Sequence, residues 1–253
     1  MRAVAVACAW MALSCGSTGG DTIDFPLAAA GPADAVAGSP LEFSNDKGWH
    51  VVLSKATLHI GGVYLNESRP ISGGQALECF LEGTYVAQQT SALTVDLLTP
   101  ALQRFPALMH GTTTPAQVGQ VWLTGARIDD TKDRTPILVI EGVADRAGVS
   151  KKFLGALRMG ANQQLKKGDL PGAFPPCKDR IVAPVDAEIT VRPVGGLVLR
   201  IDPRKFFGGV DFGALPNGTF SDGSKSTQDT LLSTNLHAAQ KGGPYVFEWA
   251  DDL

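Results

Sequence analysis

Four histidines are the side chains of this sequence best suited to acid–base or metal chemistry: His50, His59, His110 and His237. None of them forms an H-x-H, H-x-x-x-H or H-E-x-x-H pattern, so no single strand or helix presents two of them to one metal ion. His50 and His59 are nine positions apart, and in a regular strand that odd spacing places them on opposite faces unless a bulge intervenes. We therefore expect separate local roles for the histidines, with no resident metal and no other cofactor.

A serine pattern is the next candidate for chemistry. Residues 44–47 (SNDK) match S-x-x-K, in which a lysine one helical turn after a serine takes its proton. That chemistry needs the serine at the start of a helix, whereas here Gly48 and a long β-rich run follow at once. Residues 221–223 and 241–243 echo the other two elements of that signature only loosely, and no G-x-S-x-G elbow is present. We interpret the match as chance and predict no catalytic residue from it.

One loop gathers carboxylates. Residues 129–133 (DDTKD) offer the side chains of Asp129, Asp130 and Asp133, and hard cations such as Ca²⁺ take oxygen ligands from loops of this kind. The segment lacks the glycine and the final glutamate of an EF-hand loop, and Lys132 lies among the acids. We expect a solvated hairpin loop, although a composite site of His110 with Asp129 or Asp133 remains open as an alternative.

These residues must be positioned by short strands. The chain has 29 Gly, 16 Pro, 7% aromatic and 19% charged residues, which suits strands joined by turns better than a helical bundle. Its 44% hydrophobic content is enough for a core. Lys+Arg number 22 against 25 Asp+Glu, a net charge of −3 that excludes the clustered positive charge of a nucleic-acid binder. No run reaches the ~20 apolar residues of a membrane-spanning helix.

Strand-like runs are expected at 23–29, 41–43, 49–65, 76–81, 85–98, 118–128, 137–144, 152–159, 185–192, 197–201 and 245–249. Gly61 and Gly62 predict a bend in the long run. The runs 118–128 and 137–144 resemble the two arms of a hairpin, and the glycines at 195 and 196 predict a return strand after 185–192.

Helical signals are few. The pair Asp202-Pro203 predicts a helical turn through 204–207, since Asp caps a helix and Pro suits its first position. Leucine spacing predicts a helix over 227–240, and a Thr-Pro pair predicts a helix of about two turns within 99–110. The fold class is therefore mainly β: an antiparallel β-sandwich or barrel-like domain with one or two short helices.

Aromatic side chains concentrate at 206–212 and 245–249. Such rings can form a platform for a sugar or a peptide, but the alternation of Tyr245, Phe247 and Trp249 is also what a core-facing strand requires. We expect both groups to lie in the core.

The N-terminus carries an export signal. Arg2 precedes an apolar stretch over 3–13, and then come Ala12-Leu13-Ser14-Cys15 and a Gly/Ser-rich segment. The sequence ALSC resembles the lipobox of bacterial lipoproteins, although the usual leucine position, three residues before the cysteine, is occupied here by Ala12. The resemblance implies cleavage after residue 14 and a lipid on Cys15, while ordinary signal-peptidase cleavage is the alternative. It divides the chain into a signal peptide (1–14), a flexible tether (15–21) and a single β-rich domain (22–253).

The resemblance to a lipobox also implies a different fate for each of the four cysteines. Cys8 leaves with the signal peptide and Cys15 takes the lipid, so Cys79 and Cys177 remain. In an oxidising compartment two remaining cysteines most simply form one disulfide, which closes a loop of about a hundred residues and contributes ~4–5 kcal/mol in the chain-entropy model. Two buried free thiols are the alternative.

These observations favour an exported, lipid-anchored envelope lipoprotein whose β-domain binds a ligand or an envelope protein without catalysis. Lipoproteins with Asp directly after the cysteine are commonly kept at the inner membrane, so Gly16 implies the outer membrane, on the periplasmic or surface side. An exported hydrolase or metal-dependent enzyme with a site assembled from loops is the first alternative. A structural envelope component is the second.

Overall fold

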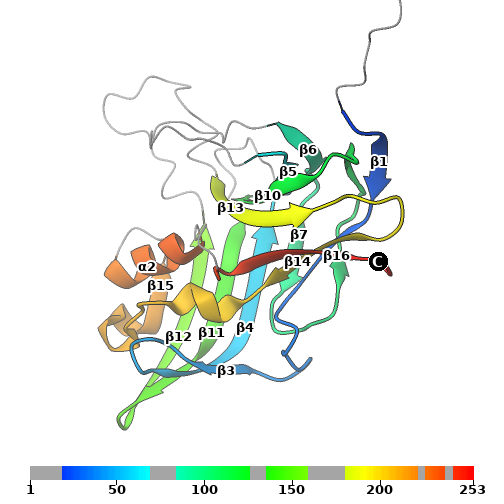
Figure 1. The fold of residues 1–253 in the computed structure, drawn as a ribbon. Helices are drawn as coiled ribbons and strands as arrows, with labels where there is room; N and C mark the ends of the chain where they lie inside the picture. Colours follow the sequence, from blue (N-terminus) through cyan, green and yellow to red (C-terminus); the bar gives the residue numbers. More distant parts are fainter. Residues whose placement is uncertain (1–18, 69–83, 126–134, 159–179, 222–225, 237–241) are drawn as a thin grey trace, which may run out of the picture.

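The computed structural model describes residues 19–68, 84–125, 135–158, 180–221, 226–236 and 242–253. In these residues the chain is mainly β, as the sequence predicts, and its strands form three sheets (Figure 1). The helical elements of these ranges are α2 (Thr227–Leu236) and the 3-10 turns η2 (Pro203–Phe207), η3 (Phe212–Ala214) and η4 (Pro216–Gly218).

The first sheet has six strands in the order β1-β9-β6-β5-β10-β13, all antiparallel to their neighbours. These strands are β1 (Thr22–Phe25), β9 (Met109–Thr112), β6 (Tyr85–Gln89), β5 (Gly62–Asn66), β10 (Ala116–Thr124) and β13 (Arg180–Ile189). Val63 and Leu65 of β5 belong to the hydrophobic core, as do Val121 and Leu123 of β10. Because side chains alternate along a strand, the residues between them lie on the opposite, outer face.

The second sheet has the order β15-β12-β11-β4-β3, with β7 (Leu93–Asp96) paired to the end of β4. Its other strands are β15 (Thr219–Ser221), β12 (Val149–Arg158), β11 (Pro136–Arg146), β4 (His50–Ile60) and β3 (Leu41–Ser44). A two-residue turn joins β11 to β12, in which Ala147 and Gly148 have φ of 49° and 79°. Two successive positive φ values mark the turn type whose twist matches a hairpin.

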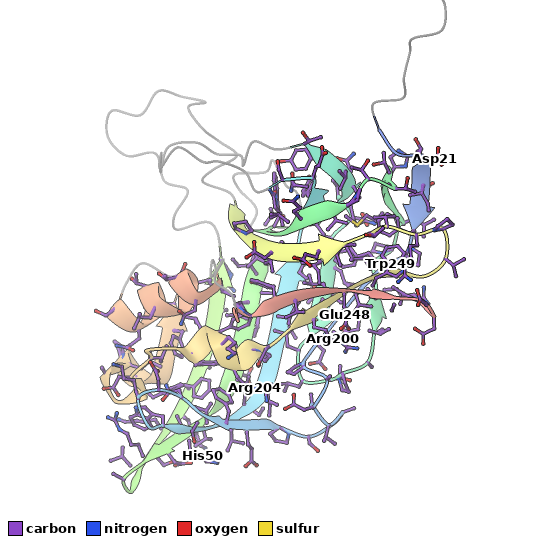
Figure 2. The ribbon with its side chains drawn as sticks, viewed as in Figure 1. Asp21, His50, Arg200, Arg204, Glu248 and Trp249 are labelled. Carbon is purple, nitrogen blue, oxygen red and sulfur yellow. The ribbon has the colours of Figure 1, made fainter. Side chains whose placement is uncertain are left out.

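The third sheet has the order β16-β14-β2-β8. Its strands are β16 (Tyr245–Ala250), β14 (Gly196–Ile201), β2 (Leu27–Ala30) and β8 (Gln103–Arg104). β14 runs parallel to β2 and antiparallel to β16. Arg200 of β14 and Glu248 of β16, both labelled in Figure 2, are diagonal neighbours in the register of these two strands. Arg200 Nε donates to Glu248 Oε1 at 2.9 Å.

A continuous stretch of chain links the second sheet to the first, because β4 leads into β5 through Gly61 alone. The Gly61 amide donates to the carbonyl of Trp122 at 2.8 Å. A Cβ at Gly61 would lie only 1.7 Å from Thr124 Oγ1, so this crossing point requires a glycine. The predicted bend is therefore present and lets one run of chain serve two sheets.

All three sheets contribute to one hydrophobic core. Trp49, Phe153, Phe207, Phe212 and Phe220 form an aromatic cluster within it. The expectation that the aromatics of 206–212 and 245–249 pack in the core is confirmed for all but Trp249, which is half-buried and packs against the core.

Two predicted strand pairings are wrong. Strands β10 and β11 do not form a hairpin, since β10 pairs with β5 and β13 whereas β11 pairs with β4 and β12. Strand β14 pairs with β16 and β2 and so does not return along β13. In both cases adjacency in sequence suggested a pairing that the three-sheet arrangement overrides.

The predicted helix within 99–110 is also absent, because this segment contains β8 and the start of β9. Gln103 explains part of the difference: its side chain accepts from Asp96 N and donates to Asp96 O, both at 2.9 Å, and so holds the segment extended beside β7. The predicted turn at 204–207 is confirmed, with Asp202 accepting a hydrogen bond from Arg204 N. The helix starting at Thr227 is confirmed as far as Leu236.

Candidate functional site

A bulge in β4 changes the expected directions of its two histidines. The register against β11 shifts between Glu141 and Gly142 and leaves Ser54 as the extra residue. His50 and His59 therefore lie on the same face of the strand, yet they are still separated by about 30 Å along it. His50 is exposed beside Glu42, whereas His59 is buried. The two histidines do not share a site.

The S-x-x-K segment forms a turn, not a helix, as the sequence predicts. Asn45 organises this turn: its Oδ1 accepts from the amides of Lys47 and Trp49, both at 3.1 Å. Its Nδ2 donates to Val210 O at 2.8 Å and so ties the β3–β4 turn to the segment after η2. Ser44 ends β3, and Gly48 takes a positive φ of 74° in the turn. The segment has a structural role.

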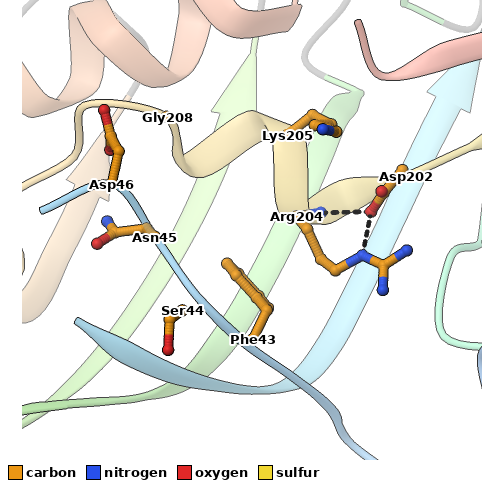
Figure 3. Close-up of a pocket in the computed structure, with 8 residues that line it drawn as sticks. All are labelled: Phe43, Ser44, Asn45, Asp46, Asp202, Arg204, Lys205 and Gly208. Carbon is orange, nitrogen blue, oxygen red and sulfur yellow. Dashed lines mark hydrogen bonds and ion pairs between the residues drawn. The ribbon is translucent and has the colours of Figure 1, made fainter. Parts of the chain in front are cut away.

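A cavity of about 490 Å³ lies between this turn and η2 (Figure 3). We call it the Arg204 pocket, and its lining includes Phe43, Ser44, Asp46, Asp202, Arg204 and Lys205. The Arg204 guanidinium donates to Asp202 through Nε at 2.7 Å and to both carboxylate oxygens of Asp34 at 2.7 and 3.1 Å. The hydrogen bond from Arg204 holds the pKa of the Asp34 carboxyl below its usual value. Three of the five N–H donors of the guanidinium are thus bound to carboxylates within the protein.

A row of polar side chains crosses the outer face of the first sheet. Strand registers align Asp24 with His110, His110 with Gln88, Gln88 with Tyr64, and Tyr64 with Gln120. We call these five residues the polar row. Neighbouring strands are ~4.8 Å apart, so the row places one hydrogen-bonding group at each such step across β1, β9, β6, β5 and β10.

The exposed end of the polar row borders a cavity of about 250 Å³ lined by Thr22, Tyr85, Gln88, His110 and Thr112, among others. His110 Nδ1 lies 2.6 Å from Asp24 Oδ1, and both side chains are more than half exposed. The carboxylate fixes Nδ1 as the donor of the neutral ring and leaves Nε2 as an acceptor. The structure therefore pairs His110 with Asp24, a partner that the sequence did not indicate.

The other end of the row is buried among aromatic rings. Tyr64 contacts Trp122 and Tyr85, with ring centroids 4.5 and 5.1 Å apart. Gln120 is fully buried, and its Oε1 accepts from the Trp122 indole at 2.9 Å. Tyr85 also lines the cavity, so the three rings of Tyr85, Tyr64 and Trp122 connect the cavity with the buried end of the row.

Two amide side chains on this face have buried polar atoms without hydrogen bonds. The Nε2 atom of Gln120 has no partner in the structure, and neither does Nδ2 or Oδ1 of Asn66. Asn66 is fully buried and lies opposite Tyr85 in the register of β5 and β6. An unpartnered buried polar group costs ~1–3 kcal/mol, so a protein that keeps such groups usually has a use for them.

Sequence reasoning did not single out Asn66, Gln88, Gln120, Tyr64 or Tyr85. A signal was present in β10, where Gln120 and Trp122 alternate with Val121 and Leu123. Reading that polar–aromatic alternation as the second face of a strand would have pointed to this surface.

Other predicted residues give a mixed outcome. Cys15, Cys79 and Cys177 lie outside the described residues, as do His237 and the carboxylates of 129–133. Within the described ranges no group of three or more His, Cys, Asp or Glu side chains is placed to hold a metal ion. No helix in those ranges has the length and apolarity to cross a membrane.

Comparison with known proteins gives no family assignment. No family model matches the chain, and no curated protein matches it. Among solved structures, MbnP from Methylosinus trichosporium aligns over 91% of this chain and 99% of its own, with 11% sequence identity and a TM-score of 0.40. We base no functional conclusion on a similarity of that size.

Proposed function

We propose that this protein is a lipid-anchored envelope lipoprotein whose β-domain binds a small ligand on the outer face of its first sheet without converting it. The single observation that carries the binding site is the pair of unpartnered amides, Asn66 and Gln120, on the same face as the cavity beside His110. Ligand sites combine apolar and aromatic surface with a few convergent polar groups, and this face has both.

The enzymatic alternative has less support. An imidazole held by a carboxylate, as in His110 and Asp24, is two thirds of the triad used by hydrolases. Within the described residues, however, no hydroxyl group is hydrogen-bonded to His110 and no second acid lies beside it. A histidine–carboxylate pair with no nucleophile hydrogen-bonded to it among the described residues favours binding over catalysis.

The anchor and the location rest on Cys15, Gly16 and the Gly/Ser segment that follows them. Two or three acyl chains hold a protein to a bilayer far more firmly than one, since each buried CH₂ contributes ~0.8 kcal/mol. The β-domain is then retained at the outer membrane and meets its ligand or a partner protein there.

Amide hydrogen exchange tests the binding face directly. The full chain, extracted in detergent, is measured alone and with two soluble fractions of an envelope hydrolysate, one of glycan fragments and one of peptides. We expect one fraction to slow exchange in Tyr85–Gln89 and Met109–Thr112, the strands that border the cavity. Exchange that no fraction slows, or that slows only around the Arg204 pocket, would refute the proposed site.

A further inference from the structure

The cavity beside His110 has a chemistry that narrows its ligand class. We propose, resting on the function proposed above, that this cavity binds a neutral saccharide. Among the residues that the structure describes, the lining contains no Lys or Arg that could attract an anion, and His110 already holds the carboxylate of Asp24. Apart from the His110–Asp24 pair, whose two groups already serve each other, the described lining therefore offers no Lys or Arg to an anion and no Asp or Glu to a cation.

The polar groups around the cavity match hydroxyl groups. Thr22 contributes a hydroxyl, Gln88 contributes an amide, and Thr112 contributes a hydroxyl oxygen that can accept, since its proton is donated to Thr114 Oγ1 at 3.1 Å. A hydroxyl donates one hydrogen bond and accepts two, while an amide side chain does both through different atoms. Sugar hydroxyls also donate and accept, so this set can bind several of them without leaving unmatched donors. The side chain of Gln88 is exposed and can turn to meet them.

Tyr85 supplies the apolar part of the site. It is 40% exposed, which is unusual for a large ring, and its other side packs on Tyr64 with ring centroids 5.1 Å apart. Tyr64 in turn packs on Trp122. A ring held in this way offers rigid contact area at little cost in conformational entropy, and the C–H face of a sugar ring is a suitable partner for it.

The size of the cavity agrees with a small ligand. Its volume of about 250 Å³ lies just below the ~300–1,000 Å³ that is typical of small-ligand pockets. One sugar ring with its hydroxyls fits such a space, whereas a helix or a folded peptide does not.

Isothermal titration calorimetry on the full chain in detergent tests the ligand class. The probes are glucose and N-acetylglucosamine with their β-linked dimers, glucuronate and glucosamine as charged counterparts, and an uncharged tripeptide. We expect at least one neutral sugar to bind and its charged counterpart to bind at least tenfold more weakly. Gln88→Leu and Tyr85→Ala should each weaken binding at least tenfold, while Tyr85→Phe, which keeps the ring, should retain most of it.

Gln117→Leu is the matched control, because Gln117 is an exposed glutamine of the first sheet that does not line this cavity. Binding of the tripeptide or of charged sugars alone overturns the saccharide assignment and leaves the binding face intact. Sugar binding that Gln88→Leu does not weaken also overturns it. Absence of any protected face in the exchange experiment removes the proposed function itself, so the two failures are distinguishable.

Discussion

Asn66→Leu should stabilise the protein, although it replaces a polar residue in the middle of the sheet structure. Both polar atoms of the Asn66 amide are buried without hydrogen-bond partners. Leu has nearly the same shape and removes a desolvation cost of ~1–3 kcal/mol. For a chain of this size each kcal/mol raises the Tm by about 2–4 °C. We therefore expect a measurable gain in stability together with loss of ligand protection in the exchange experiment.

Two other buried amides of the first sheet provide matched comparisons. Gln120→Met removes one unpartnered donor but also the acceptor of the Trp122 indole, so its two effects cancel to within about 1 kcal/mol. Gln89→Met removes an amide that donates to the carbonyls of Ala107 and Leu108 and accepts from Ser91 N and Oγ. That variant should lose about 2–4 kcal/mol.

The assay is urea unfolding of the ligand-free full chain, followed by tryptophan fluorescence, with circular dichroism to confirm that each variant retains its β structure. The expected order of stability places Asn66→Leu above the wild type, Gln120→Met near it and Gln89→Met well below it. If Asn66→Leu loses as much stability as Gln89→Met, the amide of Asn66 is bonded in the folded protein and the reasoning that gives it a binding role is wrong.

Four further outcomes are expected. Cys15→Ala should move the protein from the membrane to the soluble fraction without unfolding it, and a wild-type protein that is soluble with an unmodified Cys15 contradicts the anchor. Cys79 and Cys177 should resist alkylation under denaturing, non-reducing conditions, and reduction should cost ~2–5 kcal/mol; full labelling of both thiols refutes the disulfide. Metal analysis of the purified protein should find no stoichiometric zinc or copper, either of which would revive the enzymatic alternative. Burial raises the pKa of Tyr245, whose hydroxyl donates to Leu236 O, so stability should be fully present below the ordinary tyrosine pKa of ~10 and should fall as pH rises above it; Tyr245→Phe should be less stable at neutral pH and show a shallower alkaline loss in unfolding experiments.

Local signals in the sequence predicted most of the described elements, the helix within 99–110 excepted, but they did not predict how the strands pair. The alternation in 185–192 and 245–249 marks strands because one face of each must be buried, and the cap at Asp202 marks a helical turn because its side chain satisfies a backbone amide. The hairpin that does form, β11–β12, depends on two positive φ values at Ala147 and Gly148. The longer polar segment after Ile128 carries the stronger turn signal in the sequence, and it predicted a hairpin that does not form.

The candidate site was less accessible to sequence reasoning because it is assembled across strands. Asp24 and His110 are far apart in the chain, and only the register of β1 against β9 brings them together. The bulge at Ser54 likewise cannot be located from alternation alone, since both faces of β4 carry mixed residues there. A row across a sheet draws one residue from each strand, so no local spacing records it.

Because Asp24 lies on the edge strand β1, its contact with His110 would be sensitive to tension on the N-terminal segment. Asp24 is nine positions after Cys15, and nine residues at full extension span about 30 Å. The lipid anchor proposed above would therefore keep the proposed binding face within that distance of the bilayer. Strand β1 is hydrogen-bonded only to β9 in the described sheet, and it is the first element that tension on the anchor would load. Peeling β1 away would separate Asp24 from His110 before any other strand moved. Ligand retention would then depend on how far the envelope layers are pulled apart.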